Sequence, residues 1–274
     1  LLNINFGGSC LLLVYLYYTL YFIRNKSMNS FKYIVLLLVV LCVGSCKKDQ
    51  ILSAEDWVNA CIKSHRMDDF NNKKVAFSFR EFNYTQNKDA QGIIYTRSKK
   101  QSPEQIDVLH SKNGFSRTLN NEPVILSDSL ASVYSESVNS VLYFFRLPFS
   151  LKDTGAIKTE LKSEQIKNRL YQKIGVTFTP ENGGVDYQDT FRYWIDKETK
   201  KLDYLAYQYH SDGGGIRFRA VVNRRTIGGV VFQDYENYKA PKNSSLDELT
   251  DLYKKEKLEL ISMIINDSIR IVKQ

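Results

Sequence analysis

The chain has 274 residues, 43% of them hydrophobic and 13% aromatic, with 38 basic and 30 acidic side chains and a net charge of +8. This composition is typical of a folded protein and excludes an intrinsically disordered chain. The length allows one large β-rich domain or two small ones. Four cysteines and three histidines leave little material for a disulfide framework or a metal cluster.

The first forty-six residues predict a lipoprotein signal. Met28 opens a segment with a basic residue, Lys32, an apolar run and then Val43-Gly44-Ser45-Cys46, which is the pattern of a signal peptide that ends in a lipobox. We expect four segments: upstream sequence assigned to the chain in error (1–27), the signal peptide (28–45), a lipidated tether (46–52) and the folded domain (53–274).

Cys46 is the predicted lipidation site. Its thiol would carry diacylglycerol and its freed amine a further acyl chain, and two or three chains anchor a protein stably. An ordinary secretory signal and a two-helix membrane hairpin stay open as alternatives. The apolar runs at residues 10–23 and 34–43 are shorter than the roughly 20 residues that a spanning helix needs. Since no acid precedes Cys46, the remaining chain keeps a charge of about +5.

A capped helix is predicted at the start of the folded domain. Ser53 and Asp56 have the spacing of a capping box, and Leu52 and Trp57 occupy the positions of a hydrophobic staple. Cys61 shares a helical face with Trp57 and is the only thiol expected in the mature domain. We therefore interpret it as a small buried hydrophobe, without a disulfide partner in the same chain.

Beyond Lys74 the apolar period changes to two, which indicates β-strands. We expect one strand that continues across a bulge over residues 75–84. Asn113-Gly114 predicts a hairpin. Short strands are expected at residues 93–98, 106–110 and 115–119.

An apolar helix interrupts the strands and ends before Pro148. Its stripe has spacings of three or four and comprises Leu130, Tyr134, Val138, Val141 and Phe145.

From Thr159 to Tyr238 the pattern predicts an antiparallel meander, because its strands are separated only by short turns and a parallel crossover needs more chain. A TIM barrel and a Rossmann fold are thereby nearly excluded. Ser245 and Glu248 predict the cap of a final helix that extends to Ile264. The expected turns lie at residues 167–168, 181–184, 196–200, 211–215 and 223–229.

Several segments resemble known families. The runs Tyr204–Tyr207, His210–Arg219 and Phe232–Tyr235 are similar to an uncharacterised lipoprotein family of Bacteroidota. The order of lipobox, leading helix, aromatic strands, apolar helix and meander resembles the LolA/LppX-like half-barrel proteins.

This resemblance implies an α+β fold with a single antiparallel, strongly curved sheet. The sheet would be an unclosed half-barrel with an N-terminal helix, an inserted apolar helical lid and a C-terminal helix. It also implies a cavity for acyl chains and transfers no catalytic residue. The residues expected to line the cavity or form its lid are Leu130, Tyr134, Val138, Val141, Phe145, Phe149 and Trp194.

A polar site is predicted on the hairpin around Gly213. If the hairpin closes symmetrically there, Tyr209 lies opposite Arg217 and Tyr207 opposite Arg219, so that each arginine stacks on a ring and can meet an anionic head group. The bland alternative is a solvent-facing sheet. The candidate head-group residues are Tyr207, Tyr209, His210, Asp212, Arg217 and Arg219.

Several chemistries lack their signals. The sequence has no GxSxG, GxGxxG, P-loop, HExxH or CxxC motif. His65, Asp68 and Asp69 have metal-ligand spacing, but we favour a solvated helix end. Adjacent His210, Ser211 and Asp212 cannot form a nucleophile relay. A modest charge argues against nucleic-acid binding. We predict no catalytic residue, metal or cofactor.

We expect a non-catalytic protein of the cell envelope, lipid-anchored in the outer membrane on an undecided side, that binds an apolar or acyl ligand. One alternative is an enzyme acting on a sugar or lipid through His210, Asp212 and Arg217. An aldolase-type activity is weaker, because no βα alternation is present. Another alternative is a structural lipoprotein that binds a protein partner through a sheet edge.

Overall fold

The first helix, α3 (Ala54–Ser64), begins at the predicted cap. The structure, a computed structural model, describes residues 52–181 and 187–272. The predicted signal peptide and Cys46 lie outside the described residues. The side chain of Ser53 accepts from the Asp56 backbone N–H, and Asp56 accepts from the Ser53 backbone, so the capping box is confirmed. Trp57, Val58, Cys61 and Ile62 bury one face of the helix.

Sheet A contains seven antiparallel strands in the order β14-β1-β2-β3-β4-β5-β6. The predicted hairpin at Asn113-Gly114 is confirmed, since His110 pairs with Gly114. The single bulged strand predicted over residues 75–84 is wrong. Arg80 has a φ of 53°, and this left-handed backbone turns the chain so that Phe79 pairs with Phe82 across a hairpin. The first six strands are β1 (Lys74–Phe79), β2 (Phe82–Lys88), β3 (Ile93–Lys99), β4 (Gln105–His110), β5 (Gly114–Leu119) and β6 (Glu122–Pro123).

The apolar helix α4 (Asp128–Phe145) lies where the sequence predicts it. The Ser127 side chain accepts from the Leu130 backbone N–H at its start. After α4 comes a short helix, η2 (Phe149–Lys152). Among the described residues, no helix has the length and apolarity that crossing a membrane requires.

Sheet B contains seven antiparallel strands in the order β13-β12-β11-β10-β9-β8-β7. The turn predicted over residues 223–229 is shorter in the structure. Strand β11 continues to Ile227 through an irregularity between Val222 and Arg225, and only Gly228 and Gly229 turn, both with positive φ. The strands are β7 (Ala156–Ile166), β8 (Arg169–Phe178), β9 (Thr190–Asp196), β10 (Leu202–Tyr209), β11 (Gly215–Ile227), β12 (Val230–Lys239) and β13 (Glu259–Ile264).

The final helix predicted to reach Ile264 is wrong. Helix α5 (Leu249–Lys254) is short, because Glu256 takes a left-handed φ of 54° and the chain then runs into β13 and β14 (Asp267–Val272). β13 pairs with β12 and β14 pairs with β1. Pairing with these neighbours overrides the helical spacing of the apolar residues.

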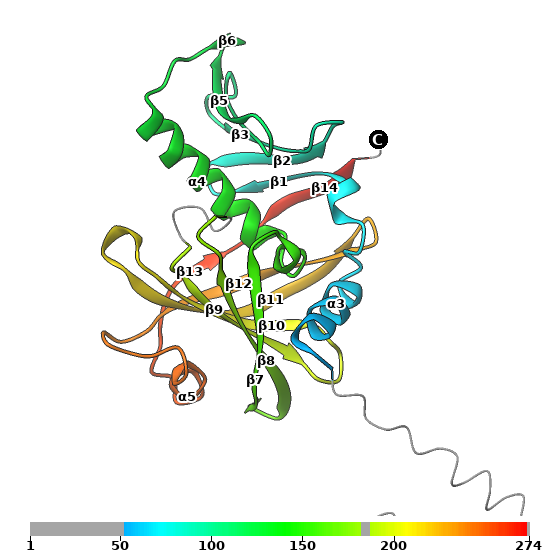
Figure 1. Ribbon diagram of the computed structural model, residues 1–274, viewed down its shortest axis with the longest axis vertical. Coiled ribbons are helices and arrows are strands. Elements are labelled where there is room, and N and C mark those ends of the chain that lie inside the picture. The colour runs from blue at the N-terminus through cyan, green and yellow to red at the C-terminus, as the bar shows by residue number, and fades with distance from the viewer. Residues whose placement is uncertain (1–51, 182–186, 273–274) are drawn as a thin grey trace, which may run out of the picture. The chain divides into compact units, whose positions relative to one another are not determined.

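The predicted class, α+β with antiparallel strands that do not close into a barrel, is confirmed, although the strands are divided between two sheets. The passage from β13 to β14 carries the chain from sheet B to sheet A. Figure 1 shows α4 crossing between the two sheets, with α5 on the other side of sheet B. We call the face of sheet B toward α4 the inner face and the face toward α5 the outer face.

The two faces of sheet B support separate cores. The main core joins α3, α4, both sheets and the inner face. A smaller core covers the outer face beneath α5. His65, which follows α3, is fully buried between strands: its Nδ1 lies 3.4 Å from the Val231 carbonyl oxygen, and its Nε2 accepts from the Leu202 backbone N–H. The solvated helix end expected at His65 is therefore wrong.

Candidate functional site

A cavity of about 160 Å³ lies between α4 and the inner face, and we call it the inner cavity. It is bounded by the C-terminal half of α4, the β1–β2 turn and strands β11 to β13. Its lining comprises Phe79, Arg80, Ser140, Val141, Phe144, Phe145, Arg219, Tyr235, Asn237, Ile264 and Asn266.

The predicted lid residues divide along α4. Val138 is fully buried and Phe145 nearly so, with the Phe145 ring stacked 3.7 Å from Phe77. Val141 and Phe145 line the inner cavity. Tyr134 instead packs on sheet A, where the Arg117 guanidinium lies 3.9 Å from its ring. Leu130 is 46% exposed, so it lines no cavity.

Phe149 and Trp194 do not line the inner cavity. Phe149 is buried in the main core against Phe70. Trp194 lies on the outer face, because side chains alternate along β9 and its neighbours Tyr193 and Ile195 point inward. Its Nε1 donates to Glu164, which also accepts from Thr250 of α5. The assignment of Trp194 to the cavity is therefore wrong.

Val138, Leu142 and Phe145 of α4 are buried in the main core beneath the helix. An apolar cavity of about 150 Å³ holds one benzene molecule, so the inner cavity has room for a head group or a few methylenes. A long acyl chain does not fit with α4 in this position.

Arg219 is the buried charged group of this site. It is 7% exposed, its guanidinium lies 3.9 Å from the Phe144 ring, and Nη2 donates to the Tyr207 hydroxyl at 2.9 Å. Its Nε has no hydrogen-bond partner, and none of the ion pairs of the described residues includes it. A desolvated ring contact contributes about 2 kcal/mol, less than the several kcal/mol that burying an ion costs.

The buried phenols of Tyr143, Tyr193 and Tyr235 do not neutralise this charge. Burial, the largest cause, raises the pKa of Tyr235 to about 12 and raises the pKa of Tyr143 and Tyr193 above the usual value. These phenols are therefore neutral at neutral pH. Tyr143 and Tyr193 share a hydrogen bond of 2.7 Å between their hydroxyls, which joins α4 to β9.

Asn237 and Arg80 are among the polar residues of the inner cavity that the sequence reasoning missed. Asn237 lies directly opposite Arg219 across β11 and β12, is 8% exposed, and its Oδ1 has no hydrogen-bond partner. Arg80 is exposed at the β1–β2 turn and stacks on Phe79. No local motif marks either residue, because the turn and the strand pairing bring them to the cavity.

The predicted arginine–tyrosine stacking forms, with a different register. Tyr207 lies opposite Arg217, and Tyr209 lies opposite Gly215. The predicted direct pairs are wrong, since the hairpin closes around residue 212 and not around Gly213. Each arginine reaches its tyrosine diagonally: Arg217 lies 5.0 Å from the Tyr209 ring and Arg219 lies 5.2 Å from the Tyr207 ring.

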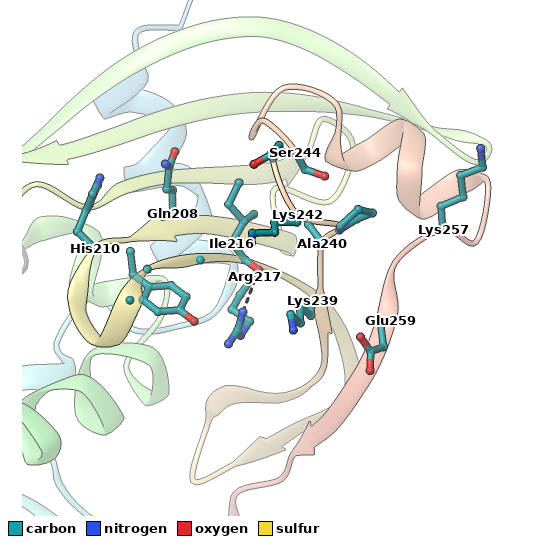
Figure 2. A pocket seen from close by; sticks show the side chains of 16 residues that line it. Gln208, His210, Ile216, Arg217, Lys239, Ala240, Lys242, Ser244, Lys257 and Glu259 are labelled. Atoms are coloured by element: carbon teal, nitrogen blue, oxygen red, sulfur yellow. Dashed lines mark hydrogen bonds between the residues drawn. The ribbon is translucent and has the colours of Figure 1, made fainter.

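A second hollow, the hairpin pocket, has a volume of about 990 Å³ at the end of the β10–β11 hairpin. Arg217, Lys239, Lys242 and Lys257 give it a basic lining, with Glu259 as an acid. Figure 2 shows Ile216 and Arg217 pointing to opposite sides of their strand, so the pocket reaches both faces of sheet B.

His210 lines the hairpin pocket and is half exposed. Its Nδ1 lies 3.3 Å from Asp189 Oδ1, and Asp189 is 5% exposed. Sequence reasoning missed Asp189, which follows a segment outside the described residues. Ser211–Gly213 form a short 3-10 turn, and the side chain of Asp212 is not among those that the structure describes.

Cys61 is buried, and burial raises the pKa of its thiol, in agreement with an inert core residue. Within residues 52–181 and 187–272, the structure has no group of three or more His, Cys, Asp or Glu side chains placed to hold a metal ion.

The fold and the inner cavity define an antiparallel α+β protein with a small hollow beneath a helix, lined by both apolar and polar side chains. The chain belongs to a family of unknown function, DUF6503, whose model matches residues 33–266. No curated protein matches the sequence. The predicted relation to Bacteroidota lipoproteins stays a prediction.

The solved structures that resemble this chain include three from different organisms. One is a LolA superfamily protein from Nitrosomonas europaea, with 12% identity, a TM-score of 0.49, and coverage of 81% of this chain and 95% of the other. A DUF1329 family protein from Desulfovibrio piger has 9% identity, a TM-score of 0.46 and coverage of 80% and 93%. A candidate outer membrane lipoprotein-sorting domain from Vibrio parahaemolyticus has 9% identity, a TM-score of 0.41 and coverage of 74% and 99%.

Proposed function

We propose that this protein is a non-catalytic, lipid-anchored protein of the cell envelope that binds an apolar or acyl ligand between α4 and the inner face. The inner cavity is the observation that supports it most, because Phe79, Val141, Phe144, Phe145 and Ile264 give it an apolar wall. Hollows that combine an apolar wall with placed polar groups are typical of small-molecule sites.

Binding a long chain requires α4 to move. The N-terminal half of α4 carries exposed Leu130 and Val133 and rests on sheet A through the contact of Tyr134 with Arg117. At the middle of the helix, Ser137 accepts a hydrogen bond from Arg97 of sheet A. The C-terminal half buries Leu142 and Phe145. We infer that α4 acts as the cover of the site and that a ligand enlarges the inner cavity by displacing the C-terminal half.

Mass spectrometry of organic extracts tests the binding function. The purified protein, delipidated and then exposed to mixed fatty acids and phospholipids, should retain lipid after gel filtration. Val141→Trp fills the inner cavity and should lose that lipid, whereas Val133→Trp adds the same ring at an exposed position of α4 and should retain it. A lipid-free extract from the unsubstituted protein contradicts the proposal.

The anchor is part of the same proposal. The lipobox at Val43–Cys46 supports a lipidated cysteine in the outer membrane, on either side of it. Cys46→Ala should abolish incorporation of labelled palmitate and release the protein from the membrane fraction. Retention of both label and membrane association in the variant argues against lipidation at this residue.

A second candidate function has one observation in its favour. His210 pairs with buried Asp189 at the edge of the hairpin pocket, and a carboxylate that orients an imidazole is typical of general-base sites. An enzyme acting on a sugar or lipid would lose turnover in His210→Ala, while Val141→Trp would leave turnover unchanged. If the protein binds lipid, Val141→Trp should abolish lipid binding and His210→Ala should leave it unchanged.

A further inference from the structure

We propose that the ligand of the inner cavity is a long-chain carboxylate, a fatty acid or similar amphiphile, whose carboxylate binds Arg219. This inference rests on the proposed binding function and names the chemical class of its ligand. The apolar lining would take the first methylenes, and Arg219 would take the charged end.

The inner cavity carries positive charge. The inner cavity is lined by two arginines, Arg80 and Arg219, and by no acid among its described residues. Arg219 is buried, and the ion pairs of residues 52–181 and 187–272 leave it without a carboxylate. Buried charges in proteins are usually paired. A ligand anion would supply the missing partner.

Free hydrogen-bonding groups surround the Arg219 guanidinium. Arg219 Nε has no acceptor. The Tyr207 hydroxyl accepts from Nη2 of Arg219, so its own proton is left to donate. Asn237 Nδ2 donates to the Ser262 hydroxyl. Because a hydroxyl can also donate, the Asn237 amide can turn and offer its N–H to the same anion.

The donors of the site match a carboxylate better than a phosphate in charge and shape. One buried guanidinium presents a planar fork of donors, which matches a carboxylate with one negative charge. A phosphate monoester carries up to two charges at neutral pH and a third terminal oxygen. Arg80, the second cation, is exposed at the turn and does not supply a second buried charge. The inner cavity therefore favours the smaller, singly charged head.

Calorimetric titration of the full chain in phosphatidylcholine nanodiscs tests the inference, with empty nanodiscs subtracted. The probes are octanoate, 1-octanol and octyl phosphate, which share a chain and differ in the head. We expect octanoate to bind about 10- to 100-fold more tightly than 1-octanol, the range that a charge-assisted hydrogen bond contributes. Octyl phosphate should bind more weakly than octanoate.

Two variants assign the effect to Arg219. Arg219→Gln should bring octanoate to within about twofold of 1-octanol. Asn237→Asp places a carboxylate directly opposite Arg219 and should also remove the preference while 1-octanol still binds. Arg270→Gln, on the exposed part of β14, is the matched control and should bind as the unsubstituted protein does. Thermal melting confirms that each variant folds.

The outcomes separate the two proposals. If 1-octanol and octanoate bind equally in the unsubstituted protein, the apolar site stands and carboxylate recognition is wrong. If octyl phosphate binds most tightly, the carboxylate class is wrong. If none of the probes binds, the proposed function itself fails. An octanoate preference that survives in Arg219→Gln overturns the role of Arg219.

Discussion

At the scale of single residues, two arginine environments in this protein make a useful comparison. Arg97 and Arg117 both bind the buried carboxylate of Asp107, with donor–acceptor distances from 2.6 to 3.1 Å. Arg219 is equally buried and has aromatic neighbours in place of an acid. The first environment stabilises the fold, and the second leaves a charge available to a ligand.

Substitution of the two sites should therefore have opposite effects on stability. Asp107→Asn leaves the buried Arg97 and the partly buried Arg117 without their anion and should lower the free energy of unfolding by about 3–5 kcal/mol. Arg219→Met removes an unpaired buried charge and should leave it unchanged or raise it. Urea unfolding measures both. A large loss in Arg219→Met would show that Arg219 is a structural residue.

His65 predicts a particular dependence of stability on pH. Burial, the largest cause, and the nearby positive charge of Arg224 lower the pKa of His65 to about 3. The unfolded chain binds a proton near pH 6.5, whereas the folded protein resists it. The stability contribution of neutral His65 is therefore complete above pH 6.5 and is lost progressively as the pH falls toward 3.

Unfolding in urea at pH 7 and at pH 4.5 checks this. Acids whose pKa is lowered in the folded protein, such as Asp56 and Asp196, also contribute stability that is lost on acidification. The comparison must therefore be made with His65→Gln, which lacks the titrating imidazole. We expect the variant to show a smaller loss between the two pH values than the unsubstituted protein, and equal losses would contradict the assignment.

At the scale of elements, α4 has two halves with different roles. Val138, Leu142 and Phe145 are buried in its C-terminal half, while Leu130 and Val133 are exposed in its N-terminal half. The Tyr143–Tyr193 hydrogen bond and the stacking of Phe145 on Phe232 attach the C-terminal half to the inner face. These contacts hold the cover in place and must loosen to admit a long chain.

Replacement of α4 side chains by alanine should cost more stability in the C-terminal half than in the N-terminal half. Leu142→Ala removes a fully buried side chain and should lower the free energy of unfolding by about 2–5 kcal/mol. Leu130→Ala, at a 46% exposed position of the same helix, should change it by less than about 0.5 kcal/mol. Chemical denaturation measures both variants, and similar losses at the two positions would contradict a buried C-terminal half.

The sequence predicts elements well where the signal is local. The Ser53 cap, the Asn113-Gly114 hairpin and the apolar stripe of α4 are each signalled by residues that lie a few positions apart in the sequence. All three elements are present. The C-terminal helix fails because the apolar residues of β13 also fit a helical spacing, and only pairing with β12 decides between the two.

The site is less predictable than the elements. Arg217 and Arg219 share a face of β11 in the sequence pattern, and nothing local shows that only Arg219 is buried. Phe144 of α4, far away along the chain, covers it. The prediction that Trp194 lines the cavity fails because the alternation along β9 places its side chain on the outer face, opposite to Tyr193 and Ile195.

At the scale of the whole molecule, α4 lies between the two sheets (Figure 1). Residues of α4 and of both sheets line the inner cavity. Sheet A supplies the β1–β2 turn, sheet B supplies the buried arginine, and α4 covers both. The hairpin pocket lies at the end of strands β10 and β11, where basic residues face solvent. A ligand with a charged head and an apolar body matches the inner cavity, which combines both kinds of surface.

Photo-crosslinking with a diazirine-bearing fatty acid tests the central claim most directly, because it maps where an amphiphile lies on the chain. Mass spectrometry of the labelled peptides should place the crosslinks in the C-terminal half of α4, near residues 140–145, and on β11 and β12 near Arg219 and Asn237. Excess unlabelled fatty acid should suppress them. Labelling confined to exposed apolar residues such as Ile125 or Leu260, or labelling that excess fatty acid does not suppress, would contradict the account.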